Sequence, residues 1–347
     1  MSSEGYLEDE AARHAIYVAF FAAHEAETVT AFIAQTISTA KARVAEGMSK
    51  YGTQRYERQI QVLQRDLAAI QSEMKVKVVG DMQKLAAQEI TYNIKVMEKV
   101  VRPTVQLHTP APQIVTSAAT FDPMSLEARK GVQRISINGA LDQFTTKKSA
   151  EIISEIQIGS ALGEPSQAIG RRLTGIHGVQ RDQASALVRT ITNHVASTAR
   201  NETLRANDDI LEGWRWISTL DGRTSHMCQS RDQKLYGWDD PRPPGHWNCR
   251  SSSVPVLKKE YAREIPGSTR PAVGPDVATA VASGTSYQQW LARQPAAFQR
   301  DVLGPNRYEL FSKGGLDLDS FVNSNGRTLT LEQLRKRRPA AFEKAGL

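Results

Sequence analysis

No proline occurs before Pro103, and the 102 residues that precede it contain only four glycines, which are Gly5, Gly47, Gly52 and Gly80. Proline breaks the interior of a helix and glycine weakens it, so a stretch this poor in both predicts long helices. We expect the first from about Glu8 to Val44 and the second to begin after Thr53, with Gly80 as a candidate kink.

The apolar residues of this stretch fall on helical stripes. The first helix carries Val29, Ile33, Ile37, Ala40 and Val44, and the second carries Tyr56, Ile60, Leu63, Leu67, Ile70 and Met74. Steps of four and three in the second set form a heptad seam. Residues 1–102 are therefore expected to form an antiparallel helical hairpin or rod, of a kind that serves assembly rather than chemistry.

Proline, glycine and tryptophan divide the rest of the chain. Residues 103–122 are expected to be an extended linker, and residues 258–285, rich in Gly, Pro and Ala, a second linker. Between them, residues 123–257 predict helices followed by strands at Trp214–Ser218 and Val254–Leu257, the latter at an edge because of Pro255. Residues 286–347 are expected to form a small helical unit. The predicted fold is mainly α with a small α+β module.

Charge and cysteine content exclude several classes of protein. Lys and Arg number 44 against 37 Asp and Glu, so the net charge of +7 permits contact with nucleic acid without requiring it. Two cysteines, Cys228 and Cys249, exclude a disulfide scaffold and suit a reducing cytoplasm. The longest apolar run near the start, Ala15–Ala23, is too short for a bilayer, and no secretory signal precedes it. We expect no stable membrane span.

One dense, turn-rich stretch carries most of the remaining information. Its notable residues are Trp216, Asp221, Arg223, Thr224, Cys228, Pro244, His246, Asn248, Cys249 and Arg250. Thr219 and Asp221 can cap a short helix from Arg223 to Ser230. A stretch with so little regular structure needs internal contacts to hold its loops together. We consider three candidates for these contacts, namely an Asp–Arg–His cluster, stacked tryptophans or a metal.

In these residues and their order, the chain resembles the phage Mu F-like minor head protein family, also called the phage head-morphogenesis family. The matching elements are Trp216, Asp221-Gly222-Arg223-Thr224, Cys228 and the run from Pro243 to Arg250. The preceding helices, including Thr198 to Thr203, are also similar, and the resemblance covers about residues 125–257. A motif of several parts in one order is more specific than any single short pattern.

Many members of the family have paired cysteines at both ends of this motif, where this chain has Ser225 and Ser251. A zinc site would therefore use Cys228, His246 and Cys249, with Asp221, His226, Asp232 or a water as the fourth ligand. The interpretation we favour here is that both cysteines are small buried apolar groups and that His246 is a hydrogen-bonded turn residue, with no cofactor. A Cys228–Cys249 disulfide would require an oxidising medium.

Catalysis is not what the pattern favours. Asp221, Arg223 and His246 show no nucleophile–base–orienter order, so we expect a salt-bridged clamp and not an enzyme. The flanking histidines of a His-Asn-His nuclease are missing, and Ser312 to Gly315 does not continue as a phosphate-binding loop.

The resemblance implies a minor structural protein of a tailed-phage head that enters the procapsid with the portal protein. Major capsid protein, scaffold and packaged DNA are further candidate partners, and Arg335, Lys336, Arg337 and Arg338 are candidate DNA contacts. The expected location is the head interior or portal vertex of the virion, and the host cytoplasm during assembly. Alternatives are an ejection protein with a membrane-active first helix, or an enzyme or toxin that carries a Mu F-like domain.

Overall fold

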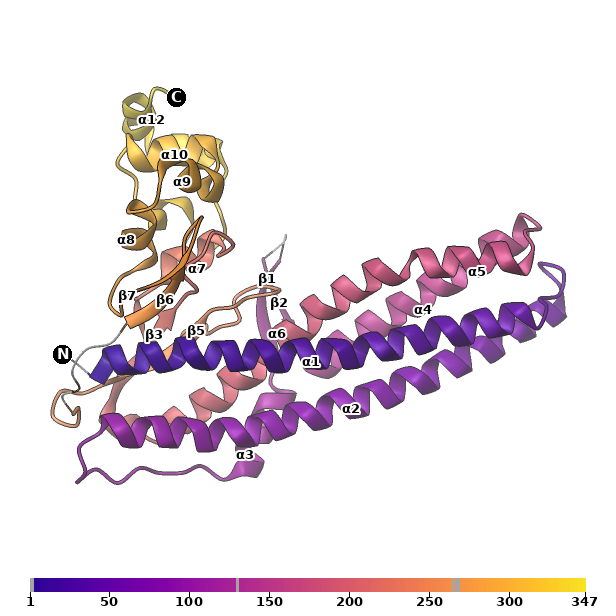
Figure 1. Cartoon of the computed structure of the whole chain (residues 1–347), viewed down its shortest axis with the longest axis horizontal. Coiled ribbons are helices and arrows are strands. Elements are labelled where there is room, and N and C mark those ends of the chain that lie inside the picture. Colours follow the sequence, from indigo (N-terminus) through magenta and orange to yellow (C-terminus); the bar gives the residue numbers. More distant parts are fainter. Residues whose placement is uncertain (1–2, 129–130, 264, 266–268) are drawn as a thin grey trace.

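The computed structural model describes residues 3–128, 131–263, 265 and 269–347. Two long antiparallel helices, α1 (Ser3–Ala45) and α2 (Gln54–Val100), run the length of the elongated part of the molecule (Figure 1). Their 43 and 47 residues correspond to about 65 and 70 Å at about 1.5 Å per residue. Thr53 caps α2 by accepting a 3.2 Å hydrogen bond from the backbone N–H of Tyr56, and the helix continues through Gly80 without a break.

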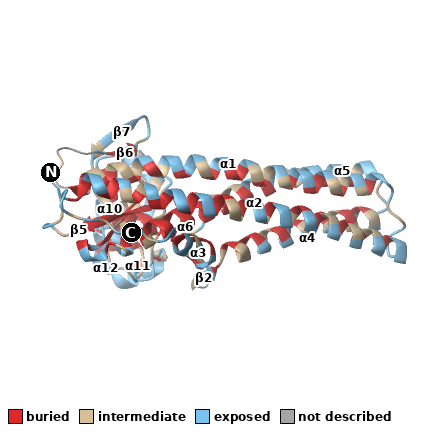
Figure 2. Ribbon diagram, turned by 90° about the horizontal axis from the view of Figure 1, so that it is seen from below, coloured by how far each residue is buried: buried red, intermediate tan, exposed pale blue. Residues whose placement is uncertain are grey.

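The heptad seam of α2 lies inside the molecule. Leu63 and Leu67 are 1% and 0% exposed, and the stripe of α1 from Val29 to Val44 belongs to the same apolar core. Three further helices contribute to this core, namely α4 (Ile137–Ala161), α5 (Ser166–Gly175) and α6 (His177–Arg205), and so do Val115, Ala119, Met124 and Leu126. Figure 2 shows the buried residues on the inward faces of the helices and exposed residues outside. The hairpin of residues 1–102 is therefore one side of a larger bundle and not a separate rod.

Two segments differ from the sequence-based expectation for residues 103–135. The second half of the expected linker 103–122 is a helix, α3 (Pro112–Phe121), with Pro112 in the first turn, where its missing N–H costs nothing. A hairpin of β1 (Met124–Ala128) and β2 (Gly131–Ile135) follows, where helix was expected. Met124 and Leu126 are buried while Ser125 between them is exposed, which is the alternation of a half-buried strand.

A small antiparallel sheet in the order β4–β3–β5 follows α6 and a short 3₁₀ turn at Asp208–Ile210. Its strands are β3 (Leu211–Ile217), β4 (Leu235–Tyr236) and β5 (Ser252–Leu257), and α7 (His226–Arg231) lies between β3 and β4 in sequence. Pro255 lies opposite Trp214 on β5, an edge strand, where the missing N–H of proline is tolerated.

The expected linker 258–285 is in part a hairpin, β6 (Thr269–Val273) paired with β7 (Ala278–Ala282). The chain then forms α8 (Tyr287–Ala292), α9 (Ala296–Leu303), α10 (Pro305–Ser312), a 3₁₀ turn at Leu318–Phe321, α11 (Leu331–Arg337) and α12 (Pro339–Ala345). These helices surround a second core that includes Trp290, Leu310 and Phe321, and they rise from one end of the bundle (Figure 1). The predicted class, mainly α with a small α+β module, is confirmed.

Among the described helices, α1 over Gly5–Ala45 is long and apolar enough to cross a membrane by length and composition alone. One side of it nevertheless contributes Val29 and Ala40, both 0% exposed, to the protein core. A buried helix of a bundle passes the same test of length and composition as a membrane span.

Candidate functional site

The dense motif folds around the inner face of β3. Trp214 and Trp216 are 1% and 0% exposed and share a small core with Cys228 and Cys249. The indole N–H of Trp216 donates to Ser218 Oγ at 3.1 Å, and that hydroxyl donates to the carbonyl of Cys228 at 2.7 Å. The sheet thereby fixes the backbone of α7 directly against the tryptophans.

The cap of α7 is Ser225, whose Oγ accepts from the backbone N–H of Cys228 at 3.4 Å. The expected caps, Thr219 and Asp221, instead hold the turn before the helix. Thr224 Oγ1 donates to the carbonyl of Thr219 at 2.6 Å and to Asp221 Oδ1 at 3.2 Å. The helix consequently begins at His226, three residues later than predicted.

Asp221 is clamped by Arg250 rather than by Arg223. Arg250 Nη2 donates to Asp221 Oδ1 at 2.8 Å and its Nη1 donates to Oδ2 at 2.5 Å, while the side chain of Arg223 is 83% exposed and 3.5 Å away. Burial alone would raise the pKa of Asp221, but the bonds from Arg250 outweigh it, so the pKa is lowered. The carboxylate is charged and fully engaged in holding the loop.

His246 belongs to a different cluster. Its Nε2 lies 3.2 Å from Cys228 Sγ and 2.9 Å from Ser225 Oγ, and the two sulfurs of Cys228 and Cys249 are 3.7 Å apart. The Asp–Arg–His arrangement considered from the sequence is thus two clusters, one of Asp221 with Arg250 and one of His246 with the cysteines.

The two thiols are electrostatically unequal. The hydrogen bond between them raises the pKa of Cys228, with burial adding to the effect, and lowers the pKa of Cys249. Burial would lower the pKa of His246, but its hydrogen bond with Cys249 and the charge of that residue raise it. A proton is therefore held most tightly at Cys228, and negative charge is most stable on the Cys249 sulfur.

The loop that carries His246 and Cys249 is bonded to α6. Asn248 has a positive φ of 62°, which asparagine tolerates better than most residues, and its N–H donates to Thr190 Oγ1 at 2.8 Å. Asn193 Nδ2 donates to the carbonyl of Cys249 at 2.9 Å. A side chain at Gly245 would place its Cβ 2.7 Å from Met227 Sδ, so the loop approaches α7 closely at this point.

Asp232 and Arg270 form a buried ion pair that the sequence analysis did not identify. The two side chains are 0% and 1% exposed, and both guanidinium Nη atoms lie 3.1 Å from carboxylate oxygens of Asp232. Asp232 also accepts from the backbone N–H groups of Ser218 and Tyr287, each at 2.7 Å. The pair joins the dense motif to β6 and to the start of α8. The only sequence signal was an aspartate in the dense stretch, because Arg270 lies in an apparent linker.

The candidate DNA contacts lie on an exposed end of the C-terminal unit. Arg335, Lys336, Arg337 and Arg338 are all exposed. Lys336 pairs with Glu332 at 2.9 Å, and the guanidinium of Arg335 stacks over Phe342 at 4.7 Å. This arrangement is that of a solvated basic helix end, and it leaves Arg337 and Arg338 facing outward.

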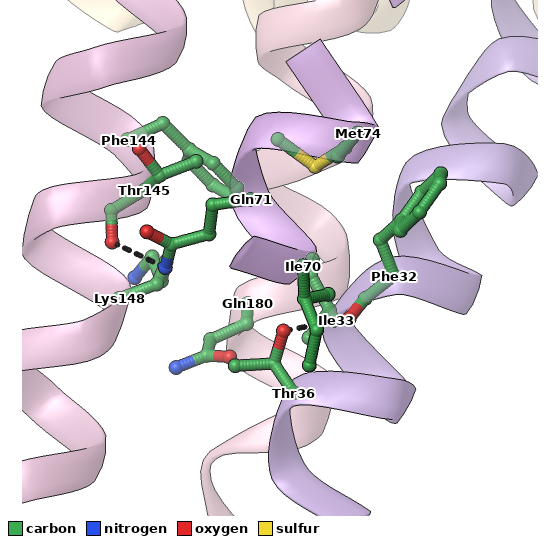
Figure 3. A pocket seen from close by; sticks show the side chains of 10 residues that line it. All are labelled: Phe32, Ile33, Thr36, Ile70, Gln71, Met74, Phe144, Thr145, Lys148 and Gln180. Atoms are coloured by element: carbon green, nitrogen blue, oxygen red, sulfur yellow. Dashed lines mark hydrogen bonds between the residues drawn. The ribbon is translucent and has the colours of Figure 1, made fainter. Parts of the chain in front are cut away.

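The described structure contains a small hollow in the bundle and a larger groove beside the motif. Figure 3 shows one of about 20 Å³ between α1, α2, α4 and α6, where Gln71 donates to the carbonyl of Thr145 at 3.1 Å. It has room for about one water molecule and not for a ligand. The other, of about 500 Å³, is a groove beside the motif with basic and acidic side chains in its wall, namely Arg134, Arg231, Arg242, His194, Glu127, Asp239 and Asp240. Because both signs of charge line it, the groove does not select a ligand by charge.

Residues 150–254 match the family described as Phage Mu protein F like protein. The match includes α6, the whole small sheet up to Val254 and every motif residue from Trp216 to Arg250. The resemblance predicted from the sequence is therefore confirmed over residues 150–254. No curated protein and no solved structure matches the chain.

Proposed function

Because the chain contains a domain of the phage Mu F-like family, we propose that it is a minor structural protein of a tailed-phage head, incorporated into the procapsid together with the portal. The observation that carries the proposal is the match of residues 150–254 to that family. The role would be in head morphogenesis, with DNA packaging or genome delivery as the step it supports. In the virion it would lie in the head interior or at the portal vertex.

The arrangement of the motif supports a structural rather than a catalytic role. Asp221 is occupied by Arg250, and His246 faces the cysteines rather than an acid. No base–orienter pair of the hydrolase type is formed by these three residues. The motif instead fixes α7 and its following loop against α6 and the sheet.

Docking to the portal would use the outer surface of α1 and not the heptad seam. The seam is buried within the bundle, whereas Ile16, Tyr17 and Phe20 on α1 are 52%, 45% and 72% exposed. Phe20 lies four residues after Ile16 and three after Tyr17, which places it beside both on the surface of the helix. We propose this face as the contact with the portal protein.

The test is co-sedimentation of the protein with procapsids assembled with and without portal, with detection by mass spectrometry. We expect recovery only with portal, and loss of recovery in Phe20→Glu. Val76 is 73% exposed on α2, so Val76→Glu is the matched control and should be recovered like the unaltered chain. Absence of the protein from both kinds of procapsid would refute the structural role. The favoured hypothesis would then be an enzyme or effector.

An ejection protein is the second candidate, and the length and apolar composition of α1 favour it. Delivery into the host would then require α1 to leave the bundle and enter the membrane. Incubation of the full-length protein with liposomes at the pH of the host surface tests this, with protease protection of α1 as the readout. Protection of α1 from protease would support the ejection role. If no protein floated with the liposomes, membrane entry under these conditions would be excluded.

A further inference from the structure

Three soft ligand atoms converge in the core beside Trp216. Within the described residues, the Sγ atoms of Cys228 and Cys249 and one ring nitrogen of His246 all lie within 4.8 Å of one another. They come from two separate segments, since Cys228 is in α7 and the other two lie in the loop before β5. Both sulfurs are buried, with the cysteines 2% and 1% exposed.

From these positions we propose that Cys228, His246 and Cys249 bind one zinc ion that has a structural role. The inference reverses the interpretation favoured by the sequence alone, and it does not depend on the proposed role in the phage head. Thiolate and imidazole together favour zinc over magnesium or calcium, which prefer oxygen ligands.

The distances fit a tetrahedral site. Bond lengths of about 2.3 Å to sulfur and 2.0–2.1 Å to nitrogen, at a tetrahedral angle, require about 3.8 Å between two sulfurs and about 3.6 Å between sulfur and nitrogen. The observed separations are 3.7 Å for the Sγ pair and 3.2 Å for Cys228 Sγ to His246 Nε2. The two sulfurs already have the required spacing. The ring nitrogen of His246 lies within 4.8 Å of the sulfur of Cys249, so the imidazole would turn toward that sulfur to bind the same ion as both thiolates.

The histidine is oriented as a zinc ligand. Its Nδ1 lies 2.8 Å from the carbonyl of Trp247, an acceptor, so Nδ1 carries the proton and Nε2 directs its lone pair toward the sulfurs. Ligating histidines usually donate their other N–H to a carbonyl or carboxylate, which fixes the tautomer and the ring plane. A histidine that served only as a turn residue would not require Nε2 to face the thiol of Cys228.

The fourth position is assigned to Ser225 or to a water beside it. Ser225 Oγ is 2.9 Å from His246 Nε2, within hydrogen-bond distance of that atom. The candidates considered from the sequence are engaged elsewhere. Asp221 is bound by Arg250, Asp232 by Arg270, and His226 Nδ1 is 3.1 Å from Gln229 Oε1.

A zinc ion here would join α7 to the loop that precedes β5. Two thiolates balance the charge of the divalent ion, so the buried site would be electrically neutral. It would replace the weak thiol hydrogen bonds of the cluster by coordination bonds, and it would add to the clamp formed by Asp221 and Arg250. Structural zinc sites contribute to folding directly, because the ligands are assembled only in the folded state.

The test is elemental analysis of the full-length protein purified under reducing conditions without chelator. We expect one zinc ion per chain, loss of zinc in Cys249→Ser and in His246→Ala, and retention in His226→Gln, the matched histidine control. Ser225→Ala should weaken binding by about 10–100-fold, the range for residues next to the ligands. Ser225→Cys should tighten it, because a third thiolate replaces a weak oxygen ligand.

A second measurement covers the case in which a variant does not fold. The unaltered protein, stripped with a chelator and titrated with Co²⁺, should give visible ligand-field bands and a near-ultraviolet sulfur-to-metal charge-transfer band, at one equivalent. Its two thiols should react with a disulfide reagent only after the metal is removed. Absence of zinc together with absence of cobalt bands would overturn the proposal, as would full zinc content in Cys249→Ser.

Discussion

The buried pair of Arg270 and Asp232 allows a quantitative test of how the C-terminal unit is attached. Arg270→Met keeps most of the length of the side chain but removes its charge and its donors. Arg270 is 1% exposed and donates to both oxygens of Asp232, to the carbonyl of Thr285 at 3.0 Å and to the carbonyl of Ser218. The variant therefore loses every one of these bonds at a site that water does not reach.

The magnitude follows from what remains around Asp232. Removal of one partner of a buried ion pair costs about 3–5 kcal/mol, because the other charge stays buried without compensation. Two backbone N–H groups, of Ser218 and Tyr287, still donate to the carboxylate at 2.7 Å. They offset part of the loss, so we expect a decrease of about 3 kcal/mol in the free energy of unfolding, the lower end of that range.

Urea denaturation measures this decrease, and hydrogen exchange locates it. Exchange should accelerate in β6, β7 and α8 more than in α1 and α2, since the pair joins only the former to the sheet. Arg293→Met, at an exposed position of the same C-terminal unit, is the control and should change stability by less than about 0.5 kcal/mol.

A double-mutant cycle decides whether the pair itself is responsible. In Arg270→Met with Asp232→Asn no uncompensated charge remains, so the double variant should be about 1–3 kcal/mol more stable than the sum of the single effects predicts. A coupling energy below about 0.5 kcal/mol would refute the reasoning, because it would mean that the two side chains act independently.

Four further predictions concern other elements. Burial lowers the pKa of His194 from 6.5 to about 4, so protonation favours the unfolded chain. As the pH falls from 6.5 to 4, the free energy of unfolding should decrease by about 1.4 kcal/mol per pH unit, about 3 kcal/mol in total. His194→Gln should flatten that part of a plot of urea midpoint against pH. Gly213→Ala should destabilise by about 1–3 kcal/mol, because φ is 151° and the new Cβ would lie 2.4 Å from the carbonyl oxygen of Tyr236. Gly80→Ala, in open space within α2, should instead raise the melting temperature by an amount equivalent to about 1 kcal/mol. Leu67→Ala, at a fully buried seam position, should lower the free energy of unfolding by about 2–5 kcal/mol in a urea denaturation assay. An unaltered pH profile in His194→Gln, an unchanged melting temperature in Gly80→Ala, or an unchanged urea midpoint in Gly213→Ala or Leu67→Ala would contradict the respective prediction.

The long helices could be predicted because their signal is local. Absence of proline and a repeat of apolar residues fix α1 and α2 to within a few residues, apart from the start of α1. The β6–β7 hairpin could not be predicted in the same way, since Gly, Pro and Ala in residues 258–285 resemble a linker. Arg270 of this hairpin pairs with Asp232, which lies 38 residues earlier. Such a pairing leaves no local pattern in a sequence.

The sequence identified most of the residues of the candidate site, but not which of them contact one another. The sequence suggested Cys228, His246 and Cys249 as a possible zinc set but favoured a structural interpretation, and the structure brings their ligand atoms within 4.8 Å of one another. The sequence did not indicate that Asp221 would take Arg250 rather than Arg223, because both arginines are part of the motif and only the turn before α7 decides between them. The sequence showed that Ser225 stands where many family members have a cysteine. That Ser225 caps α7 and lies next to His246 became evident only in the structure.

The shared core of α1, α2 and α6 has a consequence for synthesis on the ribosome. The seam of α2 is complete when Val100 has emerged, but α6, which covers part of the same core, ends only at Arg205. At about 5–20 residues per second, the half-built core stays uncovered for roughly 5–20 s. During that interval the nascent hairpin offers its apolar face to chaperones or to neighbouring nascent chains, so the order of translation, and not only the finished contacts, determines whether the bundle closes on itself.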